Sequence, residues 1–262
     1  MKKIILLLFF CSNALIVTAQ QLQTKENDHY SFSHGGIVRG DSTKKEIALV
    51  FTADEFGDGL PAIIETLQQQ NVHGSFFFTG RFYRNNAFQS YIKQLHKNGN
   101  YLGPHSNEHL LYCDWNNRDS LLVTHELFKK DIEQNLATIK TFGINTAKLH
   151  YFIPPYEWWN DSITAWSKAE GLQIMNFTPG IITNADYTYP GMDAKYKTTD
   201  SIITSLKQFE IKSKSGFNGC IILIHAGTDP RRTDKLYNRL NELITWFKSN
   251  GYQLKRVDEL LD

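Results

Sequence analysis

The sequence predicts an α/β fold, an irregular (β/α) barrel with about seven parallel strands in one domain. From residue 46 onward, short apolar runs alternate with longer amphipathic stretches, the pattern of parallel strands joined by crossover helices. No linker rich in Pro, Gly or Ser interrupts this pattern, and no internal repeat is visible. A single α/β barrel commonly takes about 250 residues. We therefore expect one domain over residues 46–262, built around one core.

The expected elements alternate in chain order. Strands are predicted at residues 47–51, 75–78, 101–103, 149–153, 172–176, 220–224 and 253–257. Helices are predicted at residues 61–70, 87–97, 124–142, 162–170, 201–212 and 235–250. Pro61 suits a first helical turn, and Gly99, Gly143 and Gly251 are well placed to end helices. Residues 20–45 are polar and aperiodic, which predicts an N-terminal arm, and residues 179–199 predict a long ordered loop.

The first nineteen residues are expected to be a signal peptide. Two lysines precede an apolar run, and the small Ala19 suits cleavage. The run is interrupted and short for a membrane-spanning helix, so we expect removal rather than retention and a periplasmic or secreted product. Lipid attachment at Cys11 is the less favoured alternative, because a bulky residue precedes it. No later segment is long enough to span a membrane.

The charge balance argues against several classes of partner. The chain has 28 basic and 27 acidic residues, so neither nucleic acid nor an anionic membrane is an expected partner. Removal of the signal peptide takes two lysines and leaves the domain essentially neutral. Only Cys113 and Cys220 then remain, too few for a disulfide scaffold. The apolar core must therefore carry the stability of the domain.

Ionisable side chains follow several of the predicted strands. The carboxyl ends of parallel barrel strands face a common cleft, so residues just past them are expected to meet. These residues are Asp54 and Glu55 after the first strand, His105 and His109 after the third, Asp186 after the fifth, and His225 after the sixth. Their convergence from distant positions predicts a functional site at this rim.

Two histidines separated by three residues, His105 and His109, can converge on one metal ion. A carboxylate beside them would leave one position open for a water molecule of lowered pKa. Alternatives remain for each residue considered alone. The pair could be hydrogen-bonded to the backbone at a helix start, the acidic cluster could be a solvated turn, and His225 could be a satisfied core residue.

The order and spacing of these motifs resemble the polysaccharide deacetylases of carbohydrate esterase family 4, over roughly residues 46–258. The family's Thr-Phe-Asp-Asp-Gly motif is matched loosely by Thr-Ala-Asp-Glu at 52–55, and its second motif well by His-Ser-Asn-Glu-His at 105–109. The Arg-x-Pro-Tyr motif is met by Ile-Pro-Pro-Tyr at 153–156, and the Leu-x-His motif by Leu-Ile-His at 223–225.

The resemblance implies a role for each matched residue. It assigns Asp54 as general base, Glu55, His105 and His109 as metal ligands, His225 as general acid, and the backbone N–H of Tyr156 as an oxyanion donor. The implied cofactor is a divalent metal, Zn²⁺ in the first place with Co²⁺ or Ni²⁺ as alternatives.

Two departures from the family pattern bear on this assignment. Glu55 replaces a shorter aspartate, and Asp58 is a rival ligand. Ile153 stands where the family has an arginine that steadies the base, so either another group orients Asp54 or catalysis is impaired. In the family an acidic residue partners that arginine, and Asp186 is the candidate for its place.

Aromatic residues close to these motifs are candidates for sugar contacts. Trp115, Trp158 and Trp159 could provide flat faces, and at least one of the two adjacent tryptophans should face solvent if the segment is extended. Leu223 and Asp186 complete the expected substrate-binding set. We expect a secreted metal-dependent hydrolase that removes acetyl groups, N-acetyl favoured, from a carbohydrate. The alternatives are a catalytically impaired carbohydrate-binding protein on the same scaffold and a cyclic-amide hydrolase of the same fold.

Overall fold

A five-stranded parallel sheet forms the centre of the molecule. The computed structural model describes residues 29–262, so the expected signal peptide and Cys11 lie outside the described residues. The strands of the sheet are β3 (Glu46–Ala53), β4 (Ser75–Phe78), β5 (Tyr101–Pro104), β8 (Ile221–His225) and β9 (Gln253–Lys255). β8 pairs with one edge of β3. On the other edge, β9 pairs with the first residues of β3 and β4 with its last residues. Both faces of this sheet are covered, which is why β3 reads as a continuous apolar run.

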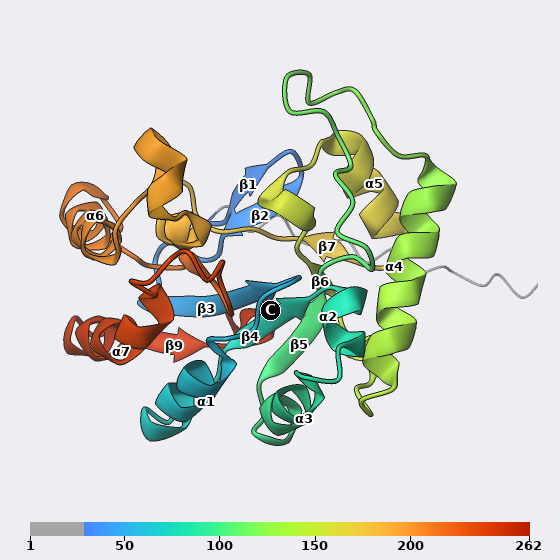
Figure 1. Cartoon of the computed structure of the whole chain (residues 1–262). Coiled ribbons are helices and arrows are strands. Elements are labelled where there is room, and N and C mark those ends of the chain that lie inside the picture. Colours follow the sequence, from blue (N-terminus) through green and yellow to red (C-terminus); the bar gives the residue numbers. More distant parts are fainter. Residues whose placement is uncertain (1–28) are drawn as a thin grey trace, which may run out of the picture.

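A second, shorter group of strands lies beside the central sheet. β6 (Tyr151–Phe152) and β7 (Gln173–Ile174) form a parallel pair, and β1 (Ser31–Ser33) and β2 (Gly36–Arg39) form an antiparallel hairpin. Ile37 bridges to Met175 at the end of β7, and Arg39 bridges to Cys220 at the start of β8. β2 therefore lies between β7 and β8 (Figure 1). All seven predicted strands are present, which confirms the predicted fold class.

The hairpin corrects the expectation of an aperiodic N-terminal arm over residues 20–45. Its strands have three and four residues, too few to display an alternating pattern in sequence. The turn between them uses positive φ values at His34 and Gly35 (44° and 69°). Ile37 and Val38 are buried, so the barrel interior, rather than local propensity, stabilises β2.

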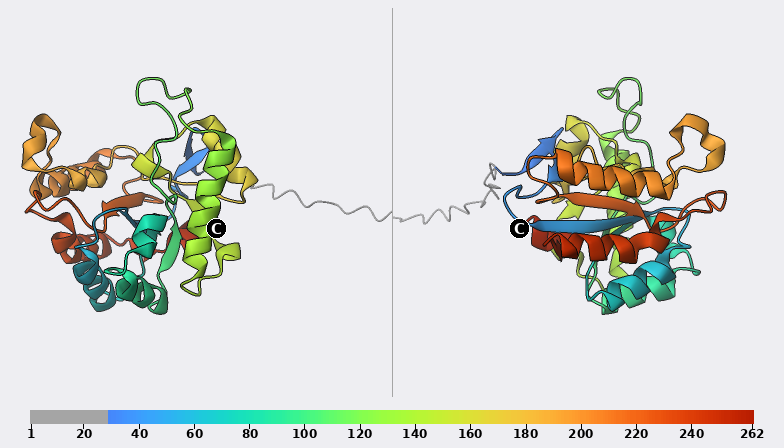
Figure 2. Two further views of the ribbon diagram at one scale, coloured as in Figure 1. Left: turned by 45° about the vertical axis from the view of Figure 1, so that its right-hand side comes forward. Right: turned by 90° about the vertical axis from the view of Figure 1, so that its left-hand side faces the viewer.

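Helices surround the strands, as Figures 1 and 2 show from three directions. The expected ones are α1 (Leu60–Gln69), α3 (Gln89–Lys97), α4 (His125–Lys140), α5 (Asp161–Ala169), α6 (Thr199–Lys212) and α7 (Leu240–Ser249). Two short helices were not expected, α2 (Gly80–Arg84) and α8 (Val257–Leu260). The 3₁₀ helices are η1 (Thr146–Lys148), η2 (Pro155–Glu157), η3 (Thr183–Tyr187), η4 (Pro190–Lys195) and η5 (Leu236–Arg239). Side chains cap the first turns of several helices. Examples are Thr124 before α4 and Thr198 before α6.

The core lies between the sheet and its helices. Phe51 of β3 stacks on Phe76 of β4 with ring centroids 4.8 Å apart, and both side chains are fully buried. A smaller cluster between α4, α5 and β7 includes Phe128 and Ile163. The two cysteines in the described part of the chain, Cys113 and Cys220, are free and buried, as expected of structural residues. Rigid packing of this kind holds the strand ends, and the residues that follow them, in fixed positions.

Candidate active site

Asp54 follows β3 and is held by the segment that follows β4. Its Oδ1 accepts hydrogen bonds from Thr79 Oγ1 at 2.9 Å and from Arg81 Nε at 3.1 Å. Its Oδ2 accepts a second hydrogen bond from the Arg81 guanidinium and lies 3.8 Å from His109 Nδ1. Arg81 therefore binds both oxygens of the carboxylate, the geometry in which an arginine–carboxylate pair is strongest.

The segment that carries His105 and His109 is fixed by buried hydrogen bonds. His105 Nδ1 lies 2.8 Å from the Ile153 carbonyl oxygen. Because a carbonyl only accepts, the ring proton is on Nδ1, and Nε2 carries a free lone pair. Asp131, buried on α4, accepts the backbone N–H groups of Asn107 and Glu108 at 3.0 Å each. The side chains of this segment are thus positioned by contacts with α4 and with the chain after β6.

Both imidazoles of this pair are neutral at pH 7. Burial lowers the pKa of His105 well below its ordinary value, and the neighbouring His109 lowers it further. Burial also lowers the pKa of His109 to about 4, although Asp54 opposes the shift. The two rings are 5.1 Å apart between centroids. Neutral imidazoles with a free nitrogen are the form in which histidine binds a metal.

His225 and Asp186 form a second, separate pair. His225 Nδ1 lies 2.5 Å from Asp186 Oδ1, and the His225 backbone N–H donates to Asp186 Oδ2 at 3.0 Å. Burial lowers the pKa of His225, but the Asp186 carboxylate and its hydrogen bond outweigh burial, so the pKa is raised. Thr52 of β3 is the register partner of His225. Asp54 and His225 therefore follow adjacent strands at the same end of the sheet.

The first turn of α2 joins the two motif segments. Gly80 N–H donates to the Ser106 carbonyl at 2.9 Å, and Arg81 N–H donates to the Asn107 carbonyl at 3.2 Å. A Cβ atom at Gly80 would lie 1.9 Å from Asn107 Oδ1, so only glycine allows this approach. The amides at the start of α2, which have no partner within the helix, are thereby satisfied.

The expected third metal ligand does not lie with the histidines. Glu55 is exposed to solvent, whereas Asp54 is bound to Arg81. Within residues 29–262, no three His, Cys, Asp or Glu side chains are arranged to hold a metal ion. The two imidazoles suit a metal, but the arrangement as a whole does not fit a three-ligand site.

Asp58, the rival ligand, is bound elsewhere. It accepts the Tyr237 hydroxyl at 2.5 Å and the Thr228 N–H at 2.9 Å, and it pairs with Lys235 at 3.0 Å. These bonds connect the loop after β3 with the loop after β8. Although burial opposes the shift, its hydrogen bonds with Tyr237 and Lys235 lower the pKa of Asp58, in keeping with a structural carboxylate.

The turn after β6 is strained, and it carries Glu157, a residue that the sequence motifs did not single out. Tyr156 and Glu157 have positive φ values of 59° and 53°, which are unfavourable for residues with side chains. Burial raises the pKa of Glu157, while the His225 imidazole lowers it, so the two groups are electrostatic neighbours. The Tyr156 ring lies 4.4 Å from His109 between centroids. The backbone N–H of Tyr156 as oxyanion donor stays a prediction.

Aromatic rings extend from His109 toward the surface. Trp115 and Tyr156 are 52% and 44% exposed, and their ring centroids are 5.7 Å apart. Trp158 lies 5.4 Å from Trp115, and the Arg118 guanidinium lies 3.4 Å above its ring. Trp115 and Tyr156 are therefore the open aromatic faces next to the histidines. Trp115 belongs to the segment between β5 and α4, which projects from the body of the molecule (Figure 2).

Three of the expected substrate contacts are buried instead. Trp159 is 3% exposed and donates its indole N–H to the His34 carbonyl, so it packs against the hairpin. Leu223 is fully buried within β8, and Asp186 is fully buried against His225. The alternation expected for an extended segment explains the contrast between the two neighbouring tryptophans. Asp186 thus acts through His225 rather than on a solute.

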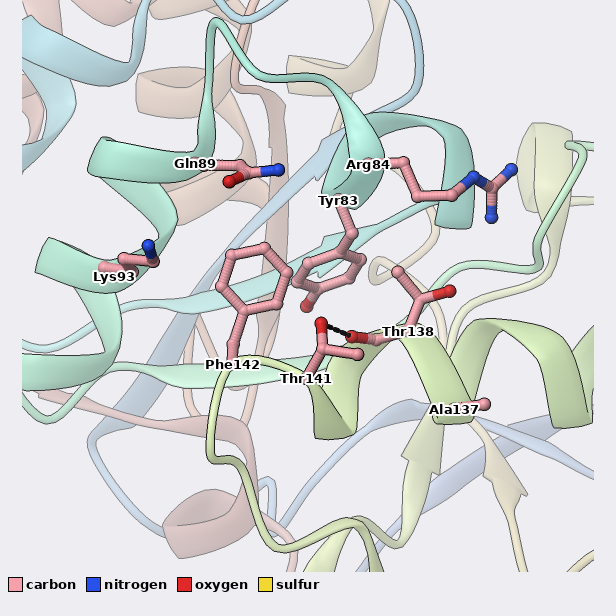
Figure 3. Close-up of a pocket in the computed structure, with 8 residues that line it drawn as sticks. All are labelled: Tyr83, Arg84, Gln89, Lys93, Ala137, Thr138, Thr141 and Phe142. Carbon is pink, nitrogen blue, oxygen red and sulfur yellow. Dashed lines mark hydrogen bonds between the residues drawn. The ribbon is translucent and has the colours of Figure 1, made fainter.

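A cavity of about 480 Å³ lies away from these residues, between α2, α3 and α4 (Figure 3). It is lined by Tyr83, Arg84, Gln89, Lys93, Ala137, Thr138, Thr141 and Phe142. None of the predicted site residues is among them. Arg84 reaches away from the cavity to Asn107 and Glu108, at 2.5 and 2.8 Å. The cavity is therefore not the candidate active site.

Comparisons with known proteins give similarity to polysaccharide deacetylases. The family model for polysaccharide deacetylases matches residues 39–175, more than half of the chain. Peptidoglycan-N-acetylmuramic acid deacetylase PdaA of Bacillus subtilis (strain 168) is 23% identical over 222 residues, which cover 85% of this chain and 73% of that protein. An uncharacterized 30.6 kDa protein of Geobacillus stearothermophilus is 23% identical over 237 residues, which cover 90% of this chain and 78% of that protein.

Solved structures share the fold. BA3943 of Bacillus anthracis, a CE4 family pseudoenzyme, is 20% identical with a TM-score of 0.67, covering 88% of this chain and 70% of that one. A BA3943 mutant with restored enzymatic activity gives the same TM-score at 21% identity, covering 88% and 72%. PdaA of Bacillus subtilis gives 0.64 at 20% identity, covering 88% and 93%. None of the helices within residues 29–262 has the length and apolar character needed to cross a membrane.

The His225–Asp186 pair predicts a measurable change in pKa. Replacing Asp186→Asn should lower the pKa of His225 by roughly one unit or more, because the opposing charge is removed. The raised pKa also stabilises the fold, fully below the unfolded value of 6.5 and progressively less as pH rises through the folded value. NMR titration of the ring protons gives the shift, with Asp200→Asn on exposed α6 as control. An unchanged pKa would contradict the pairing.

The histidine pair predicts which substitutions alter zinc binding. Any Zn²⁺ that the wild-type protein binds should be lost in His105→Ala, because this change removes one of the two neutral imidazoles. Glu55→Ala should have a smaller effect, because this side chain faces solvent. Calorimetric titration with Zn²⁺ after chelation measures both. Equal losses in the two variants would restore Glu55 as the third ligand and contradict the described arrangement.

Proposed function

The chain belongs to the polysaccharide deacetylase family, and we propose that it is a hydrolase that removes acetyl groups, N-acetyl in preference to O-acetyl, from a carbohydrate. The observation that carries the proposal is the His225–Asp186 pair at 2.5 Å, at the end of the strand next to the one that presents Asp54. A candidate acid and a candidate base thus lie at the ends of adjacent strands. Cleavage of an amide requires both groups.

His225 is the proposed general acid. Asp186 occupies Nδ1 and favours the protonated ring, so Nε2 carries the proton that can be donated. The leaving amine of an N-acetyl group departs poorly as an anion and needs this proton as the C–N bond breaks. Because Asp186 is fully buried, its charge is poorly screened by solvent, and it holds the ring in one orientation.

Asp54 is the proposed general base. Its carboxylate would take a proton from the water molecule that attacks the acetyl carbonyl carbon. Thr79 and Arg81 limit its rotation, which keeps the accepting oxygen in place. The open faces of Trp115 and Tyr156 adjoin His109, and they would stack against sugar rings so that the acetyl group reaches the acid and the base.

Metal dependence is a further part of this proposal. The family is generally metal-dependent, and the neutral pair His105 and His109 would contribute two ligands for Zn²⁺, or for Co²⁺ or Ni²⁺. The arrangement within residues 29–262 lacks a third ligand. The roles proposed for Asp54 and His225 require no metal ion. Secretion is likewise proposed from the signal peptide expected at residues 1–19, with a periplasmic or secreted enzyme as the outcome.

A second candidate function is glycan binding without turnover. It is favoured by the exposed Glu55 and by Ile153, which removes the family arginine. The similarity to BA3943, a pseudoenzyme of the same fold, shows that the scaffold can exist in such a form. In this case the aromatic faces would serve binding alone, and His225 would have no leaving group to protonate.

Acetate release distinguishes the two candidates. Wild-type protein should release acetate from N-acetylated oligosaccharides or peptidoglycan fragments, and Asp54→Asn and His225→Gln should each lower kcat by about 100-fold or more. Asp200→Asn, an exposed carboxylate on α6, is the matched control and should retain activity. Retention of the glycan by wild-type protein with no acetate released, with or without added Zn²⁺, would overturn the first function in favour of the second.

A further inference from the structure

The position of the missing family arginine offers no cation to Asp54. Ile153 is fully buried, and its carbonyl accepts His105 Nδ1. The adjoining turn contributes Tyr156 and Glu157, which carry no positive charge. A base carboxylate without a partner would rotate freely and lose the alignment on which proton transfer depends.

A cation nevertheless reaches Asp54 from another element. Arg81, the second residue of α2, donates through Nε to Oδ1 at 3.1 Å and through a terminal nitrogen to Oδ2. Thr79, which caps α2, donates to Oδ1 at 2.9 Å. The two residues come from the carboxyl end of β4, next to β3 in the sheet. Arg81 thus steadies the base, the role that the resemblance assigns to an arginine at position 153.

We propose that Arg81 is the positioning residue for Asp54 and takes over the role of the arginine absent at Ile153; this inference rests on the proposed deacetylase function. Arg81 orients the carboxylate and balances its charge, and it makes no contact with the leaving group. The cation that binds the carboxylate therefore comes from the helix after β4 and not from the loop after β6.

The contacts select one oxygen atom as the base. A carboxylate has about four lone-pair positions, and Thr79 and Arg81 fill two on Oδ1 and one on Oδ2. One position is left, on Oδ2, and His109 Nδ1 lies 3.8 Å from this oxygen. Water held beside His109 would therefore give its proton to Oδ2.

The neighbouring arginine does not share this role. Arg84, one turn further along α2, binds Asn107 and Glu108 instead. Arg81 is fixed by its backbone as well, because its N–H donates to the Asn107 carbonyl at 3.2 Å. The guanidinium is thus aimed by the same turn that holds the histidine segment. Its side chain is 48% exposed, so small solutes can reach the place it fills.

The first experiment removes the side chain and measures steady-state acetate release. Arg81→Ala should lower kcat roughly 100-fold with little change in KM, because the base is misaligned while the sugar contacts remain. Arg81→Lys should recover little, since an ammonium group cannot bind both oxygens. Arg239→Met is the matched control, because Arg239 is 42% exposed and also binds carboxylates. It should leave kcat unchanged.

Chemical rescue separates positioning from folding. Guanidinium ion at concentrations far below denaturing levels should raise the kcat of Arg81→Ala at least tenfold, whereas sodium chloride should not. Wild-type protein and Arg239→Met should not respond. An Arg81→Ala variant with wild-type or higher kcat would overturn the proposal, because Arg81 would then be dispensable or inhibitory. Failure of guanidinium to rescue a folded Arg81→Ala variant would also count against it.

A third measurement is independent of turnover. Thermal unfolding of Arg81→Ala, Asp54→Asn and the double variant forms a cycle. The loss in Tm caused by Arg81→Ala should largely disappear in the Asp54→Asn background. Additive losses would overturn the pairing even in an active enzyme. Coupled losses in a protein that releases no acetate would uphold the pairing and reject only the deacetylase function.

Discussion

The first turn of α2 is the constraint on which the site depends. Thr79 and Arg81 bind Asp54 after β3, while Gly80 N–H and Arg81 N–H bind the carbonyls of the histidine segment after β5. The ends of three adjacent strands are therefore joined by one turn of five residues. The free amides of a helix start and the absence of a Cβ at Gly80 make so close an approach possible. Without this turn, the base and the two imidazoles would be separate features of the same rim.

The site divides into groups of different electrostatic character. His105 is buried and His109 half-buried, and both are kept neutral, whereas the half-buried His225 is kept basic by Asp186. The same residue type thus serves two purposes, because burial dominates the pKa values of His105 and His109, whereas the hydrogen-bonded Asp186 carboxylate outweighs burial at His225. Environments that separate the pKa values of like groups are characteristic of catalytic sites. Asp58 and Asp131, which are bound on several sides, stabilise the surrounding loops instead.

Sequence reasoning located the sheet because its strands are uniformly apolar and separated by amphipathic stretches. The rule that active groups follow strand ends also placed Asp54, His105, His109 and His225 at one rim. The same rule applied to β4 would have found Arg81, which follows that strand by three residues. The hairpin could not be predicted, because its strands are stabilised by distant β7 and β8. The burial of Trp159 and the outward direction of Glu55 likewise depend on tertiary contacts that no local pattern encodes.

Arg81, rather than a set of metal ligands, holds the Asp54 carboxylate in the folded protein. Crystal structures of the full domain, grown with Zn²⁺ and with chelator, test this arrangement. We expect Arg81 on both oxygens of Asp54 in each crystal, with Thr79 on Oδ1. An Asp54 turned away from Arg81 to share a zinc ion with the two histidines would contradict it.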